Sequence, residues 1–161
     1  EFYMLFKSGF GSLRFWQQHG HASIVVMILI ILLVIAIGII FDMIGASSLT
    51  SKESTFHSMN AKKIKGAKET IKLIKNNVKI SSICNDIVGD ICGIVSGGLG
   101  AVLAISIANI TKVNISLISV ITAALISSLT IGGKAIFKTV AIKNSDKIIF
   151  SVGKLLSFFK K

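Results

Sequence analysis

The sequence predicts an all-α membrane protein with three transmembrane helices plus amphipathic juxtamembrane helices. Apolar residues make up 52% of the 161 residues, and the mean hydropathy is +0.79, which is high for a soluble domain of this size. The formal net charge is nevertheless +11, and the charged residues are segregated from long apolar runs, as in membrane proteins. The chain contains no proline, so any interruption of a helix must come from glycine or from an inserted side chain.

Residues 1–21 form an aromatic N-terminal segment in which phenylalanine, tyrosine and tryptophan mix with basic residues. This composition favours an interfacial segment whose rings lie at headgroup depth. The alternative is a segment that is foreign to the native protein or a loosely ordered tail. The transmembrane domain is predicted over residues 22–161. Its first span, residues 22–41, carries no charge and covers about 30 Å, the thickness of a hydrocarbon core.

Residues 42–80 are rich in lysine, with eight lysines and three acidic residues. Between residues 61 and 79, apolar residues recur at spacings of three and four, which predicts one helix with an apolar face and a basic face. Such a helix is typical of a membrane surface. The apolar positions are Ile64, Ala67, Ile71, Ile74 and Val78.

The second and third spans are predicted over residues 83–110 and 115–133. The tail, residues 134–161, has seven lysines, whereas the turn between the two spans has only Lys112. The positive-inside rule therefore places 42–80 and 134–161 in the cytoplasm of a cell-membrane protein, with the N-terminus outside. We expect the lysines to face anionic lipid headgroups. The tail repeats the amphipathic pattern with Ile136, Val140, Ile148, Phe150, Val152, Leu155, Leu156 and Phe159.

Three polar side chains interrupt the beginning of the second span. Asp86 and Asp90 are four residues apart, hence on one helix face, and Asn85 adds an amide oxygen. Carboxylate and amide oxygens suit a hard cation such as Mg²⁺, and a carboxylate within a bilayer is usually functional or faces another helix. For Asp86 the alternative is a hydrated place at the headgroup boundary, paired with Lys79.

Glycines repeat every four residues along the second span. This small-xxx-small pattern lets helix backbones approach closely, either within the chain or in a homodimer. Exposure of backbone carbonyls to an ion in a broken helix is the alternative reading. The predicted helix-packing positions are Gly89, Gly93, Gly97 and Gly100.

Other functional classes find little support in the sequence. A single arginine without interleaved aromatics argues against nucleic-acid binding. Cys84 and Cys92 are too far apart along one helix for a disulfide, and they suit small packing positions. The sequence lacks a nucleophile–base pair, zinc-ligand spacing and a nucleotide-binding loop, so we expect no enzyme activity.

Four stretches carry a resemblance to a known family. Ser51–Ser58 (SKESTFHS) is similar to a SETALTS stretch, and Gly66–Asn76 to a helix of the form RAK…LLEN. Ser82–Asp86 (SICND) stands where that family opens its second span with IGNN, and Gly132–Ala141 followed by Asn144 resembles GEVLPKTLAARN. The family is the transmembrane domain of CorC/CorB and CNNM-type magnesium and cobalt transporters, and the resemblance covers about residues 41–156. The paired CBS domains that usually follow have no counterpart here.

The resemblance implies a homodimeric, divalent-cation transporter-like domain with Mg²⁺ as ion. It points to Asn85 as the second-span asparagine and to Ser51 or Ser54 as ion-site serines. Gly133 replaces the family's glutamate, for which Asp86 or Asp90 would substitute. A membrane scaffold or partner subunit that keeps the fold without transport is the first alternative. A holin-like membrane permeabiliser, suggested by small size and a basic tail, is the second.

Overall fold

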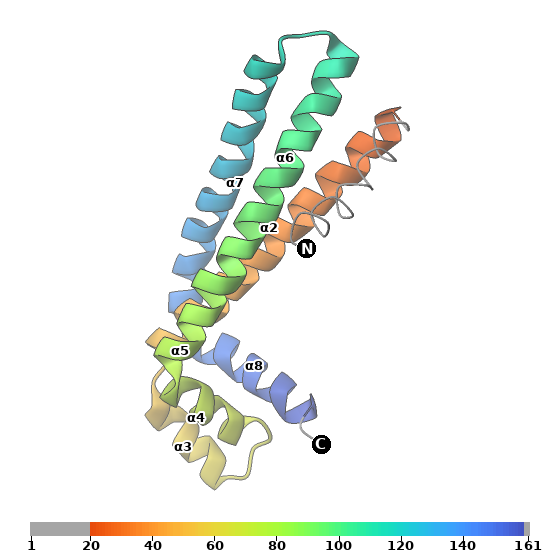
Figure 1. The fold of residues 1–161 in the computed structure, drawn as a ribbon. Helices are drawn as coiled ribbons and strands as arrows, with labels where there is room; N and C mark the ends of the chain where they lie inside the picture. Colours follow the sequence, from red (N-terminus) through yellow and green to blue (C-terminus); the bar gives the residue numbers. More distant parts are fainter. Residues whose placement is uncertain (1–19, 160–161) are drawn as a thin grey trace, which may run out of the picture. The chain divides into compact units, whose positions relative to one another are not determined.

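The structure is a computed structural model that describes residues 20–159, and all regular structure within them is helical (Figure 1). Three stretches are long and apolar enough to cross a membrane, which confirms the predicted fold class: Ile24–Thr50, Asn77–Thr111 and Ile115–Lys143. The prediction for residues 1–21 falls, except for the last two residues, outside the described part of the chain.

Helices follow one another with short connections. In chain order they are α2 (Gly20–Thr50), α3 (Glu53–Ala61), α4 (Ala67–Lys75), α5 (Asn77–Ser82), the π-helix η1 (Ile83–Val88), α6 (Gly89–Thr111), α7 (Ile115–Lys143) and α8 (Ser145–Phe159). Together α5, η1 and α6 make up the second candidate span.

The first and third long helices extend beyond the predicted span limits. α2 contains 31 residues, about 46 Å at 1.5 Å per residue, which exceeds the roughly 30 Å of a hydrocarbon core. It continues through Asp42 to Thr50 because small and apolar residues follow the acid and no proline stops the helix. α7 likewise runs past residue 133 to Lys143. Asp42 therefore belongs to a long helix and not to the lysine-rich connection.

The chain divides into two compact units. Of the described residues, the first unit holds 20–35 and 94–129, which are parts of α2, α6 and α7. Within it Met27, Ile31 and Ile35 are buried along one stripe of α2. Gly100 of α6 lies against the Ile126 side chain of α7, where a Cβ would overlap the Ile126 Cδ1 atom. Small residues thus allow close helix contacts in this unit.

The second unit, residues 36–93 and 130–159 of the described chain, joins three span ends. Ser47 Oγ near the end of α2 donates a hydrogen bond to the Ala141 carbonyl of α7 at 3.5 Å. Ser48 Oγ donates mainly to the Gly45 carbonyl of its own helix at 2.8 Å and more weakly to the Asn77 carbonyl at the start of α5 at 3.4 Å. The lysine-rich connection and the lysine-rich tail therefore leave the spans at the same end, as an odd number of spans requires.

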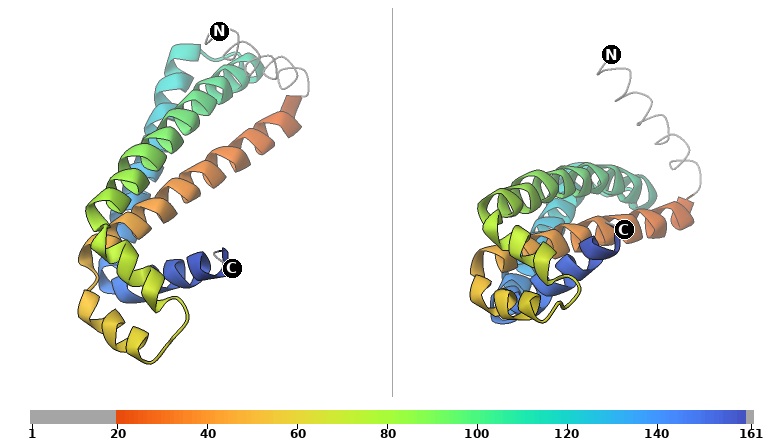
Figure 2. Two further views of the ribbon diagram at one scale, coloured as in Figure 1. Left: turned by 60° about the horizontal axis from the view of Figure 1, so that its bottom comes forward. Right: turned by 90° about the horizontal axis from the view of Figure 1, so that it is seen from below.

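Three short helices, α3, α4 and α8, pack into a small hydrophobic core in this unit (Figures 1 and 2). The core consists of Phe56 from α3, Ile71 and Ile74 from α4, and Ile149 from α8. The Phe56 ring also stacks on Phe150, with 6.2 Å between centroids and 20° between planes. The apolar face of α4 is consequently covered by protein, so the prediction that this face rests on a membrane is wrong for Ile71 and Ile74.

The predicted single helix over residues 61–79 is also wrong in its length. Gly66 precedes α4 with a φ of +93°, a left-handed conformation that suits glycine, and α4 ends before Asn76. The two outer positions of the predicted face are exposed, Ile64 by 40% and Val78 by 72%. The spacing of apolar residues continues across the turns at Gly66 and Asn76, on either side of α4. Spacing alone does not reveal where a helix is interrupted by a turn.

Candidate functional site

The second span meets α2 at Gly45. The side-chain amide of Asn85, in η1, occupies the place that a Cβ would take at Gly45, and its Oδ1 atom would overlap such a Cβ. Asn85 Nδ2 donates a hydrogen bond to Ser81 Oγ at 3.2 Å. A glycine in α2 and a hydrogen bond to its own helix together fix the position of the amide.

The Oδ1 atom of Asn85 is buried and has no hydrogen-bond partner in the described chain. A buried acceptor without a partner costs about 1–3 kcal/mol, and such groups in native proteins often receive a water or an ion. Asn85 also lies in a π-helix, a rare geometry that is frequent at functional sites. These observations mark the Gly45–Asn85 contact as the candidate functional site.

A buried carboxylate, Asp42, lies one turn before Gly45 and is 9% exposed. One turn before it, a Cβ at Gly38 would lie 3.1 Å from Cys92 Cβ. Because positions 38, 42 and 45 share a helix face, Asp42 lies on the face of α2 that meets the second span. Burying a carboxylate inside a protein is costly unless it is paired or binds an ion. From sequence, Asp42 was predicted in the lysine-rich cytoplasmic segment 42–80, although the apolar and small residues directly after it are compatible with a continuing helix.

A lysine approaches the second span from α7. Lys134 Nζ lies 3.1 Å from the place of a Cβ at Gly89, the first residue of α6, one turn after Asn85. No described acidic group lies within 4.0 Å of this ammonium. The positive charge of Lys134 is unfavourable for a cation bound close to it.

The two predicted acidic ligands of the second span, Asp86 and Asp90, are exposed, whereas Asn85 packs against α2. Asp86 Oδ2 accepts a hydrogen bond from Ser82 Oγ at 2.6 Å, and Asp90 lies in the first turn of α6. The structure therefore does not bring these carboxylates to the Gly45–Asn85 contact. Their role as ligands stays a prediction.

The two predicted serine ligands differ in their surroundings. Ser51 directly follows α2, and its backbone N–H donates to the Ser47 carbonyl at 3.0 Å. Its Oγ atom is buried and has no hydrogen-bond partner in the described residues. Ser54 is exposed in the first turn of α3. Ser51 is thus a second buried oxygen without a partner, at the end of the helix that carries Gly45.

The atoms of Asn85 and Asp42 that could coordinate a metal ion are oxygens. In residues 20–159 no group of three or more His, Cys, Asp or Glu is placed to hold a metal ion. Asn85 Oδ1 and the Asp42 carboxylate are the ligand types that Mg²⁺ takes, and Mg²⁺ commonly keeps several waters beside one or two carboxylates. The residues present fit a largely hydrated cation and not a fully dehydrated one.

The four predicted packing glycines fall into two pairs. A Cβ would overlap Ile126 at Gly100 and would lie 3.1 Å from Lys134 Nζ at Gly89, so these two serve contacts within the chain. A Cβ at Gly93 or at Gly97 would meet no atom within 4 Å. The first half of α6 therefore has room for larger side chains or for another helix at these two positions.

Comparisons of the chain with protein-family models, with curated proteins and with solved structures give no match. Fold and hydropathy define its class as an all-helical protein with three candidate membrane spans.

Proposed function

We propose that this chain is a multi-pass membrane protein that binds a partly hydrated divalent cation at the Gly45–Asn85 contact and conducts it across the bilayer. The observation that carries the proposal is the buried Asn85 Oδ1 atom without a hydrogen-bond partner. Asp42 on the same face of α2 supplies the negative charge. The oxygen donors and the sequence resemblance described above both favour Mg²⁺, with Co²⁺ as the second ion to test.

The proposed orientation places α3, α4 and α8 in the cytoplasm and the N-terminus outside. Its support is the gathering of the lysine-rich connection and the tail at one end of the spans, which the hydrogen bonds of Ser47 and Ser48 establish. Segments with an excess of lysine stay on the cytoplasmic side of a membrane.

Mg²⁺ flux into liposomes containing the purified chain tests the proposal, with an entrapped fluorescent indicator as the readout. We expect Asn85→Ala to lower the flux about tenfold or more, as loss of groups around a metal usually does. Asn109→Ala is the matched control, because Asn109 is an exposed asparagine near the end of α6 and its loss should leave flux unchanged. Equal flux in the Asn85→Ala variant and the wild type would refute the site.

A non-transporting scaffold is the second candidate, and specific observations favour it. Asp86 and Asp90 are exposed, and Lys134 brings a positive charge close to Gly89, one turn after Asn85. The room beside Gly93 and Gly97 suits association with a second copy. This candidate predicts no flux in any variant, and association that depends on α6.

A further inference from the structure

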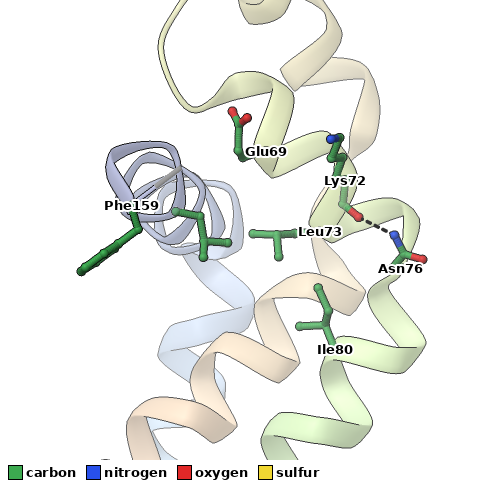
Figure 3. A pocket seen from close by; sticks show the side chains of 7 residues that line it. Glu69, Lys72, Leu73, Asn76, Ile80 and Phe159 are labelled. Atoms are coloured by element: carbon green, nitrogen blue, oxygen red, sulfur yellow. Dashed lines mark hydrogen bonds between the residues drawn. The ribbon is translucent and has the colours of Figure 1, made fainter. Parts of the chain in front are cut away.

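A groove lies in the second unit where α4, α5 and α8 meet (Figure 3). Its volume is about 460 Å³, within the range of small-molecule sites. The lining combines four apolar side chains with three polar ones. The residues are Glu69, Lys72, Leu73, Asn76, Ile80, Leu156 and Phe159.

The polar and apolar side chains occupy different sides of this groove. Figure 3 shows the charged ends of Glu69 and Lys72 on the side away from Ile80, while Leu73 lies between α8 and the start of the second span. Ile80 belongs to that span, which begins at Asn77. The apolar side of the groove therefore continues into a helix that is suited to hydrocarbon, and the charged side is the one remote from it.

α8 adds an apolar stripe whose C-terminal half is exposed. Leu155 and Phe159 are exposed by 61% and 77%, and Ile148 and Val152 are half-buried at positions that continue the same helical stripe. Amphipathic helices that lie in a membrane interface expose such a stripe toward the acyl chains.

The groove has a basic edge. Lys72 lines the groove, Lys68 and Lys75 lie on the same face of α4, and Lys79 follows in α5 beyond the turn at Asn76; all four are exposed. Lys75 Nζ lies 3.6 Å from the carboxylate of Glu53, and the other three lysines have no ion pair with a described residue. The ammonium of Lys72, which has no ion pair within the described chain although Glu69 also lines the groove, attracts a negatively charged headgroup.

We propose that this groove holds one anionic phospholipid. Its acyl chains lie against Leu73, Ile80 and Leu156, with Phe159 at the open end, and its phosphate lies at the edge marked by Lys72. The inference requires the chain to be in a bilayer but is independent of the cation site, because the groove shares no residue with the Gly45–Asn85 contact.

Native mass spectrometry of the full chain, extracted from bilayers of equal parts phosphatidylglycerol and phosphatidylcholine, tests the proposal. We expect the wild type to retain phosphatidylglycerol in preference. Phe159→Ser should lower this retention about tenfold, because it removes the aromatic surface that the acyl chains would cover. Phe158→Ser is the matched control, because the neighbouring ring is 80% exposed and does not line this groove. Equal losses in both variants, or equal retention of the two lipids by the wild type, would overturn the proposal.

A second pair of variants tests the headgroup contact. Lys72→Gln should reduce the preference for phosphatidylglycerol about fivefold. Lys147→Gln removes the same charge from an exposed position of α8 that lies outside the groove, so the preference should persist. An equal loss of preference in the Lys72→Gln and Lys147→Gln variants would show that the total charge of the chain attracts the lipid. That result would contradict a headgroup contact at this groove.

Discussion

Gly153 of α8 lies directly over Thr70 of α4. A Cβ at Gly153 would overlap Thr70 Oγ1 and would lie 2.9 Å from the Gly66 carbonyl oxygen and 3.0 Å from the Thr70 backbone nitrogen. Thr70 Oγ1 in turn donates to that carbonyl at 2.8 Å. Both residues are buried, so the contact of α4 with α8 depends on a glycine at this position.

Replacing Gly153 by alanine should therefore destabilise the protein by about 1–3 kcal/mol, the usual cost of overpacking. Thermal unfolding in detergent, followed by circular dichroism, measures the change. Gly132→Ala is the control, because a Cβ at Gly132 in α7 meets no atom within 4 Å and alanine favours a helix by about 1 kcal/mol. A Gly153→Ala variant as stable as the wild type would contradict the contact.

Gly45→Ala should abolish cation flux without removing any proposed ligand. The added Cβ takes the place of the Asn85 amide and forces it out of its position. Flux into liposomes is the measurement, and Gly98→Ala is the control because its Cβ would lie in open space. Unchanged flux in the Gly45→Ala variant would show that transport does not depend on the position of the Asn85 amide.

Substitutions of the buried Asp42 and of the exposed Asp90 are expected to have different effects on flux. If Asp42 supplies the charge of the site, Asp42→Asn should lower flux about tenfold or more, and Asp90→Asn should leave it unchanged because Asp90 is exposed. Assays of both variants at the same Mg²⁺ gradient decide between them. Loss of flux in Asp90→Asn alone would reinstate the ligand set predicted from the sequence.

Membrane orientation can be measured by labelling cysteines from one side of intact cells. In a variant whose two native cysteines are serine, a membrane-impermeant maleimide should label Lys112→Cys in the turn between α6 and α7. It should label Ser58→Cys in α3 only after the cells are permeabilised. The reverse pattern would show that the lysine-rich segments lie outside.

Association of two copies through α6 predicts sensitivity to bulk at Gly97. Gly97→Leu should shift the chain from dimer to monomer in detergent, as measured by light scattering, because a large side chain keeps helix backbones apart. Ala124→Leu makes a similar change at an exposed position of α7 and should leave the oligomeric state unchanged. A dimer that survives Gly97→Leu would exclude this helix face.

The number of spans could be predicted from sequence because a bilayer requires about twenty consecutive apolar residues. The ends of the helices could not, since a helix continues past the edge of an apolar run wherever nothing stops it. α2 shows this at Asp42, where the first charged residue marks neither the end of the helix nor a place exposed to solvent.

The packing of α8 shows a second limit of periodicity. Ile149 is completely buried, yet it was absent from the predicted apolar pattern, which included the neighbouring Ile148. Both residues are equally apolar, and hydropathy does not distinguish a face that packs on protein from a face that is left open. The small residue Gly153, one turn later, determines which side approaches α4.

Of the two residues that form the candidate site, Asn85 could be predicted from the sequence and Gly45 could not. Asn85 is conspicuous as an amide within an apolar run, and the structure shows its Oδ1 atom buried without a partner. Its neighbour Gly45 lies on another helix, and no local spacing pairs two residues so far apart in sequence. The exposure of Asp86 next to the burial of Asn85 likewise depends on which face of the helix α2 covers.

The small core of α3, α4 and α8 also has a consequence for biosynthesis. Phe56, Ile71 and Ile74 precede the second and third spans in the chain, whereas Ile149, which completes their core, follows both. At ordinary rates of synthesis Ile149 emerges on the order of ten seconds after Ile74. Until then the apolar side of α4 has no protein cover, and the core can close only when all three spans have been made. Formation of the core of α3, α4 and α8 therefore depends on prior synthesis of all three spans.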